Sequence, residues 1–156
     1  MHPTAERIQQ VLHDLGVETQ VVEFTESTRT SADAAAAIGT TVGQICKSIV
    51  FAVDGSPLMV MASGVNRIDT TKVEQTIGKL LGKANAAFVR DKTGFAIGGV
   101  PPVGHLERFP IFVDRDLLQY DIIYAAAGTP NTIFPISSAD LVRVTGATVL
   151  DCRVDG

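Results

Sequence analysis

Apolar residues recur at helical spacing at the start of the chain and in several later segments. Apolar residues at positions 8, 11, 12 and 15 share one helical face and Gly16 supplies a stop, so the pattern predicts a helix over about residues 4–15. Polar caps and glycine stops predict four shorter helices: 34–38 after the capping sequence 30–33 and before Gly39, 69 or 70 through 81, 85 to 94, and 137 or 138 through 142.

Segments rich in β-branched residues alternate with these helices and predict strands. They lie at residues 21–24, 45–53, 58–62, 95–97, 111–113, 122–126, 132–136 and 147–150. The turn sequence Asp54-Gly55-Ser56-Pro57 joins the second and third of them into a hairpin. Because few connections repeat a regular βαβ unit, we expect an α+β fold with a mixed β-sheet rather than a doubly wound parallel sheet.

The composition is typical of one globular domain. Of the 156 residues, 46% are hydrophobic and 19% are charged, which is enough apolar material for one continuous core over residues 1–156. No apolar run approaches the roughly 20 residues that cross a bilayer, and the N-terminus lacks the basic start and apolar stretch of a signal peptide. We therefore expect a cytoplasmic protein with no membrane partner.

Charge is unevenly distributed along the chain. The formal net charge of −4 argues against a general polyanion binder, and we expect no DNA partner. Residues 67–92 nevertheless hold six basic and three acidic residues, and the two helices predicted in this segment carry the basic ones. The segment is either a local phosphate-binding surface or a solvated helix face rich in lysine.

The usual catalytic motifs are absent from the sequence. Residues 78–84 have the wrong spacing for a P-loop, no GxGxxG motif follows a strand, and Ser63-Gly64 lacks the frame of a hydrolase nucleophile. The three histidines are isolated, which argues against a zinc enzyme. Cys46 and Cys152 are too far apart in sequence for a CxxC pair, so we expect reduced, mainly structural cysteines.

Lys47 lies in the otherwise apolar segment 45–51, where strand alternation points its side chain to the same side as Ile45 and Ile49. A charged side chain on an apolar face is costly. Lys47 therefore either extends its amine to solvent at the start of the strand or points a cation into a cleft. In a cleft, that cation could hold a phosphate or a carbonyl oxygen.

Two glycine-rich segments lie in the second half of the chain. Residues 94–105 combine glycines, which leave the backbone accessible, with prolines that fix its direction, so their amides could line a site for an oxyanion or a ribose hydroxyl. Residues 125–131 lead the small residues of a strand into a tight turn and leave room for a ligand. Ordinary turn and packing roles also explain both segments.

Together, these segments resemble the YbaK family of aminoacyl-tRNA deacylases, which is related to the editing domain inserted in bacterial prolyl-tRNA synthetases. The resemblance runs nearly end to end. It rests on residues 44–51 around the family lysine, here Lys47, on residues 93–105 with the family's GxxxP loop from Gly98 to Pro102, and on residues 127–131. The segments 31–39 and 63–69 also resemble the standalone members of the family.

The resemblance implies a trans-editing hydrolase that cleaves the ester between a mischarged amino acid and the terminal adenosine of tRNA, which serves translation fidelity. It implies a mixed sheet that closes towards a barrel with surrounding helices, and neither a metal nor an organic cofactor. Lys47 would orient the terminal phosphate and the ester, the amides of the GxxxP loop would hold the amino-acid end, and a substrate hydroxyl would assist the attacking water. Positioning of this kind can suffice for an activated ester, so no strong nucleophile is required.

The resemblance implies further contacts and the partners. We expect substrate contacts from Ser48, Gly98, Gly99, Val100, Pro101, Pro102 and Gly128. His105 ends the glycine-rich loop and either lines the pocket, as we expect, or lies on the surface. The basic segment supplies the expected tRNA contacts, which are Lys72, Lys79 and Lys83. Ser48 stands where alanine-specific members typically carry asparagine, which argues against specificity for alanine. The expected partners are a mischarged aminoacyl-tRNA and an aminoacyl-tRNA synthetase.

Two other functions are compatible with the sequence. A non-catalytic module of the same fold would bind tRNA or a synthetase through the basic segment, and a binder of small phosphate compounds would use Lys47 as its cation. The presence of Lys47 and of an intact 98–102 loop favours the enzyme, because a pure binding module needs neither of them in a pocket.

Overall fold

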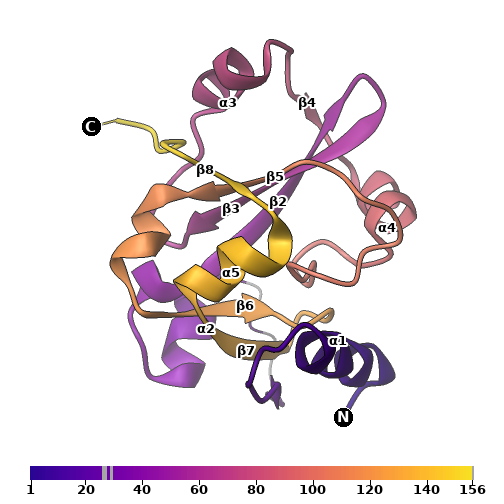
Figure 1. Ribbon diagram of the computed structural model, residues 1–156, viewed down its shortest axis with the longest axis vertical. Coiled ribbons are helices and arrows are strands. Elements are labelled where there is room, and N and C mark those ends of the chain that lie inside the picture. Colours follow the sequence, from indigo (N-terminus) through magenta and orange to yellow (C-terminus); the bar gives the residue numbers. More distant parts are fainter. Residues whose placement is uncertain (26–27, 29, 156) are drawn as a thin grey trace.

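Two β-sheets with five α-helices around them make up the computed structural model, which describes residues 1–25, 28 and 30–155 (Figure 1). The larger sheet has the strand order β4 (Gly82–Lys83), β2 (Cys46–Val53), β3 (Ser56–Ser63), β5 (Ile111–Asp114) and β8 (Thr148–Leu150). The smaller sheet has the order β1 (Val22–Glu23), β7 (Thr132–Ser137) and β6 (Ile122–Ala126).

The strands β2 and β3 form the predicted hairpin. Asp54 and Gly55 between them have φ angles of 52° and 80°, as a tight two-residue turn requires. β3 then pairs in parallel with β5, and β5 pairs in parallel with β8. Because β2 and β3 are antiparallel, the larger sheet is mixed, which confirms the predicted α+β class.

The two sheets meet at one point of the chain that the structure describes. Ile45 and Tyr124 form an isolated parallel bridge, which joins the start of β2 to the middle of β6. Within the smaller sheet, β7 pairs in antiparallel fashion with both β1 and β6. Because this single bridge is the hydrogen-bonded link between the sheets, they do not close into a barrel, and in this detail the fold differs from the expectation.

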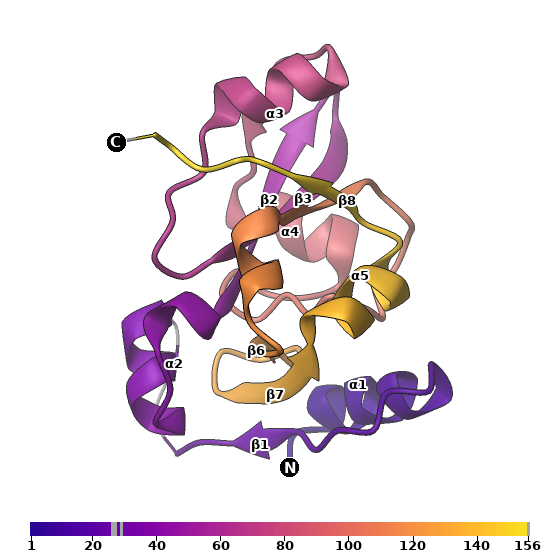
Figure 2. The same ribbon diagram turned by 60° about the vertical axis from the view of Figure 1, so that its left-hand side comes forward.

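The helices lie around the sheets (Figure 2), and each of them has buried residues. They are α1 (Pro3–Asp14), α2 (Ser31–Ile38), α3 (Thr70–Ile77), α4 (Ala86–Thr93) and α5 (Ser138–Thr145). Ala5, Ile8 and Leu12 of α1 are fully buried in the main core, together with Phe134 of β7 and Met59 of β3. None of the described helices has the length and the apolar character that crossing a membrane requires.

Two predicted elements differ from the structure. The third helix ends at Gly78, which has a φ of 73°, so it does not continue to residue 81 and Leu80 is 81% exposed. The segment 95–97 is not a strand. Its Phe95 is buried in the main core, and the carbonyl of Ala96 accepts a hydrogen bond from the amide of Gly99, so the chain turns there.

Candidate active site

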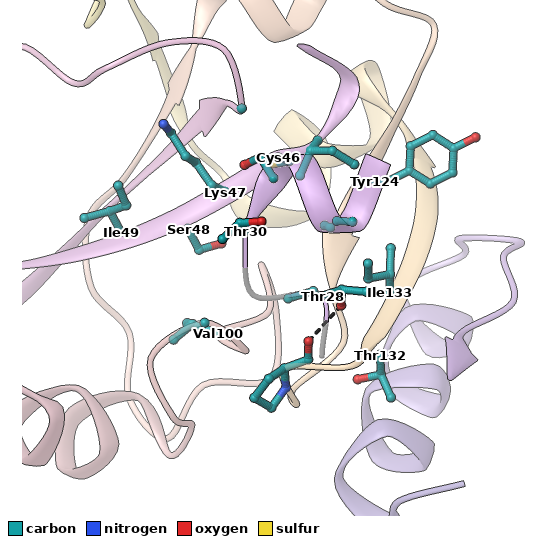
Figure 3. A pocket seen from close by; sticks show the side chains of 18 of the residues that line it. Thr28, Thr30, Cys46, Lys47, Ser48, Ile49, Val100, Tyr124, Thr132 and Ile133 are labelled. Atoms are coloured by element: carbon teal, nitrogen blue, oxygen red, sulfur yellow. Dashed lines mark hydrogen bonds between the residues drawn. The ribbon is translucent and has the colours of Figure 1, made fainter. Parts of the chain in front are cut away.

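A cleft of about 530 Å³ lies where β2 of the larger sheet approaches the smaller sheet (Figure 3). Lys47, Ser48 and Ile49 of β2 line it. Residues 94–105, which we call the glycine-proline loop, contribute Gly98 and Val100. The remaining lining residues are Thr28, Thr30, Ser31, Ala32, Ala34, Val42, Ile45, Cys46, Gly64, Ile97, Tyr124, Ala125, Ala126, Thr129, Pro130, Thr132 and Ile133. All three segments singled out from the sequence therefore converge on one cleft.

Lys47 is half-buried at one end of this cleft. It pairs with Ala62 across the hairpin, and its Nζ donates a hydrogen bond to the backbone carbonyl of Asn66 in the turn after β3. In Figure 3 its amine points away from Val100 and Thr28. An ammonium has three N–H groups, of which the described residues engage one, so two can serve a ligand.

The environment of Lys47 weakens its hold on the proton. Burial lowers the pKa of this ammonium, because the charged form loses hydration. The carboxylate of Asp114 raises the pKa and the guanidinium of Arg67 lowers it, and the balance lies below the usual value for lysine. A half-buried cation of this kind interacts more strongly with a ligand anion than a lysine in open solvent does.

Ser48 places an unpaired polar atom beside the cleft. Its Oγ is buried and has no hydrogen-bond partner among the described residues. Ser48 also lines a smaller cavity of about 130 Å³, which shares Ile49, Ile97 and Val100 with the main cleft and is otherwise lined by Val50, Ala84 and Val89. A buried hydroxyl without a partner costs roughly 1–3 kcal/mol, so a ligand group that pairs with it gains affinity.

The glycine-proline loop reaches the cleft through backbone contact with the 127–131 turn. A Cβ at Gly99 would lie 2.8 to 3.0 Å from the backbone C, Cα and N atoms of Thr129, so only glycine allows this approach. The amide of Gly99 donates to Ala96, whereas the amides of Gly98 and Val100 donate to no backbone group in the described part of the chain. A backbone amide that no other backbone group engages can donate to a ligand oxygen.

Four other residues of the predicted site do not line this cleft. Gly99, Pro101, Pro102 and Gly128 are all buried. Gly128 has a φ of 104°, and a Cβ there would lie 2.7 Å from Thr4 Cγ2 and 3.3 Å from Phe95 Cε1. Glycine at 128 therefore lets the turn pack against α1, which supports the cleft from behind.

His105 also lies outside the cleft. Its ring sits beside Phe95 and Phe109 and lines a separate cleft between the loop, α1 and α5. The Nε2–H donates a hydrogen bond of 2.6 Å to the carbonyl of Pro101. Burial lowers the pKa of His105, the bond to Pro101 raises it and Arg7 lowers it, so the neutral ring is favoured. His105 therefore holds the loop through Pro101, outside the cleft that Lys47 lines.

The basic segment differs from the expected pair of lysine-rich helix faces. Lys72 of α3 is 3.0 Å from Asp155 and 3.3 Å from Asp151, so its ammonium holds the C-terminal segment. Lys79 follows the end of α3 and is 3.0 Å from Asp54. Lys83 is exposed on β4. The expectation that helices carry these cations is wrong for Lys79 and Lys83, because α3 ends at Ile77 and α4 begins at Ala86.

Part of the cleft wall has no signal in the local sequence. Thr30 is identified only as a helix cap, and its Oγ1 does accept a hydrogen bond of 3.0 Å from the amide of Asp33. Thr30 lines the cleft because of the way α2 packs, and the positions of Tyr124 and Ile133 likewise depend on packing.

Among the described residues, no three His, Cys, Asp or Glu side chains are grouped as a metal ion would require.

Comparison with known proteins shows which family this chain resembles in sequence and in structure. The model of the aminoacyl-tRNA editing domain matches residues 25–144. The crystal structure of a proposed trans-editing enzyme for prolyl tRNA synthetase is 43% identical, with 99% of both chains covered and a TM-score of 0.94. The hypothetical protein APE2540 is 29% identical, with 95% of this chain and 99% of that chain covered and a TM-score of 0.87.

One further relative is known from its sequence. The uncharacterized protein YwhH of Bacillus subtilis (strain 168) is 30% identical over 125 residues, which are 80% of either chain. The family match extends over most of the chain and contains Lys47, the glycine-proline loop and the 127–131 turn. This protein therefore belongs to the family of aminoacyl-tRNA editing domains, as its resemblance to YbaK indicates.

Proposed function

We propose that this protein is an aminoacyl-tRNA deacylase that acts in trans and hydrolyses the ester between a mischarged amino acid and the terminal adenosine of tRNA. One observation carries the proposal: Lys47, Gly98 and Val100 line the same cleft, and the amides of Gly98 and Val100 donate to no backbone group among the described residues. Its volume of about 530 Å³ is in the range of small-molecule sites, which suits the aminoacylated end of a tRNA.

The proposed chemistry relies on positioned charge rather than on a nucleophilic side chain. Attack of water on the ester carbonyl places negative charge on the carbonyl oxygen. The amides of Gly98 and Val100 would stabilise this oxyanion, while Lys47 would hold the terminal phosphate and the ester. A hydroxyl of the substrate would assist the water. The leaving group is a ribose oxygen, which takes up a proton as free tRNA is released.

The smaller cavity is the proposed place for the amino-acid side chain. Its walls are apolar apart from Ser48 Oγ, and its volume is about 130 Å³. These properties favour a small aliphatic side chain or one with a hydroxyl that pairs with Ser48, and disfavour charged and large aromatic side chains. Ser48→Ala should therefore reduce the preference for a hydroxylated side chain over its aliphatic counterpart.

For the tRNA itself, we propose Lys79 and Lys83 as contacts to backbone phosphates. Lys83 is exposed, and the partner of Lys79 is the highly exposed Asp54, so that ion pair contributes little to stability and is easily replaced by a phosphate. Lys72 is less available because two carboxylates hold it.

The test is the release of radiolabelled amino acids from a panel of aminoacyl-tRNAs. The panel contains tRNA for proline charged correctly and charged with alanine, serine, threonine, valine or phenylalanine. We expect release of a small mischarged residue and much slower release of proline. A protein that binds these tRNAs without releasing any amino acid would instead be the non-catalytic binding module. Binding of free nucleotides but not of tRNA would indicate a binder of small phosphate compounds.

A further inference from the structure

Asp114 is a buried carboxylate outside the residues that line the cleft. It lies at the end of β5 and is 1% exposed. Its Oδ2 accepts hydrogen bonds from the backbone N–H of Ser63 at 3.1 Å and from Nδ2 of Asn66 at 2.8 Å. Its Oδ1 accepts from the backbone N–H of Asp116 at 2.9 Å. Burial of a carboxylate costs free energy unless hydrogen bonds of this kind compensate for it, so the groups that bind Asp114 are held close to it.

Through these bonds, Asp114 fixes the turn that follows β3. Asn66 is 7% exposed, and its amide N–H donates to the carbonyl of Ser63 at 2.9 Å. The second hydrogen of Asn66 Nδ2 is directed to Asp116 Oδ2 at 2.8 Å. The backbone carbonyl of Asn66 in turn accepts the hydrogen bond from Lys47 Nζ. A continuous series of contacts therefore runs from Asp114 through Asn66 to the ammonium in the cleft.

We propose that Asp114 is a positioning residue, which holds the 63–66 turn so that the carbonyl of Asn66 fixes the Lys47 ammonium at the end of the cleft. The proposal rests on the proposed function, in which Lys47 orients the substrate. A lysine side chain has many rotamers, and a fixed acceptor for one N–H selects among them. Displacement of a catalytic group by about 1 Å can cost on the order of 100-fold in rate.

The charge of Asp114 acts on the same ammonium. Among the described residues, two charged groups act on Lys47: Asp114 from β5, and Arg67 from the turn after β3. Asp114 raises the pKa of Lys47 and so opposes burial and Arg67, which both lower it. Asp116, in the 3-10 helix η2 (Arg115–Gln119), is paired with Arg153 at 3.1 Å. Removing the charge of Asp114 should therefore favour the neutral amine at Lys47.

The experiment compares Asp114→Asn and Asn66→Ala with the control Asp54→Asn. The control also removes one carboxylate, but at the exposed hairpin turn at the other end of β2, roughly 20 Å along the strand from Lys47. Asparagine tolerates the positive φ of residue 54. Thermal unfolding of every variant records its stability.

Two readouts separate positioning from a merely structural role. The pKa of Lys47 is measured by NMR after reductive ¹³C-methylation of the lysines, with the resonance assigned by its absence in Lys47→Arg. We expect Lys47 to titrate at lower pH in Asp114→Asn and at the wild-type pH in Asp54→Asn. We also expect kcat for deacylation to fall at least 10-fold in Asp114→Asn and Asn66→Ala with little change in KM, and to be unchanged in Asp54→Asn.

The proposal is overturned if Lys47 titrates identically in Asp114→Asn and wild type, or if Asn66→Ala keeps the wild-type kcat. Should Asp114→Asn not fold, the kcat of Asn66→Ala decides the question. If the wild-type protein releases no amino acid from any aminoacyl-tRNA, the proposed function fails. The NMR titration still decides whether Asp114 controls Lys47, so the two failures are distinguishable.

Discussion

Replacing Gly99 by alanine perturbs the loop that lines the cleft together with Lys47, and it changes no charged group. The added Cβ would lie 2.8 to 3.0 Å from three backbone atoms of Thr129, whereas non-bonded carbon atoms normally approach to about 3.5–4.0 Å. The backbone of Thr129 cannot rotate away as a flexible side chain would. The loop and the 127–131 turn must therefore separate by about 0.5–1 Å.

This separation should affect both stability and catalysis. Overpacking of this kind typically costs about 1–3 kcal/mol in the free energy of unfolding. The amides of Gly98 and Val100 move with the loop, and displacement of catalytic groups by about 1 Å can reduce rates by on the order of 100-fold. We therefore expect Gly99→Ala to lower kcat for deacylation by about 10-fold to 100-fold.

The assay combines steady-state deacylation with thermal unfolding, and Gly16→Ala is the control. Gly16 has a φ of 78° and no atom within 4 Å of its added Cβ. The control should lose about 1–2 kcal/mol from backbone strain and keep the wild-type kcat. If Gly99→Ala also keeps the wild-type kcat, the loop does not contact the reacting ester and the assignment of its amides is refuted.

Three further predictions concern pH, metal ions and tRNA binding. Burial is the largest effect on the pKa of Lys47 and lowers it, so the ammonium loses its proton below the usual pH range for lysine. We therefore expect kcat to fall as pH rises through this lowered pKa, and initial rates corrected for spontaneous ester hydrolysis measure the decrease. Deacylation should be unaffected by EDTA, and zinc-dependent restoration of a lost activity would contradict this expectation. The double variant Lys79→Ala, Lys83→Ala should bind tRNA more weakly and with a flatter salt dependence, while hydrolysis of a short aminoacyl-nucleotide at saturation stays unchanged; an unaltered salt slope would show that tRNA binds elsewhere.

The elements that follow from local sequence signals agree with the structure. The hairpin of β2 and β3 is specified by two segments of strand-forming apolar residues and by Asp54-Gly55, whose backbone geometry suits a two-residue turn. The caps at Thr30 and Asn85 also form as predicted. Each of these signals acts within a few residues, so the rest of the fold hardly affects it.

The errors arise where distant segments decide the outcome. Phe95 lies in an apolar segment that is typical of a strand, but its burial in the main core anchors a turn instead. The separation of the two sheets depends on which strand edges meet, and local sequence does not specify this. Where burial and turn geometry compete with strand propensity, the tertiary contacts determine the structure.

The candidate site was partly predictable for the same reason. The apolar surroundings of Lys47 predict either an amine that extends to solvent or a cation in a cleft, and Lys47 is half-buried and lines a cleft. His105 is adjacent to the glycine-proline loop in sequence, yet Gly104 turns the chain with a φ of 83° and the ring lies outside the cleft. The contact of Asn66 with Lys47 joins the turn after β3 to β2, and no sequence motif indicates it.

Single-turnover deacylation by the wild-type protein and by Lys47→Ala tests the central claim most directly. The substrate is the mischarged tRNA that the wild-type protein hydrolyses fastest, at saturating protein, and circular dichroism shows that both proteins are folded. Removal of a half-buried charge should leave the fold intact. We predict that the rate constant falls at least about 100-fold in Lys47→Ala while tRNA binding persists. A folded Lys47→Ala protein that releases the amino acid at the wild-type rate would contradict the account.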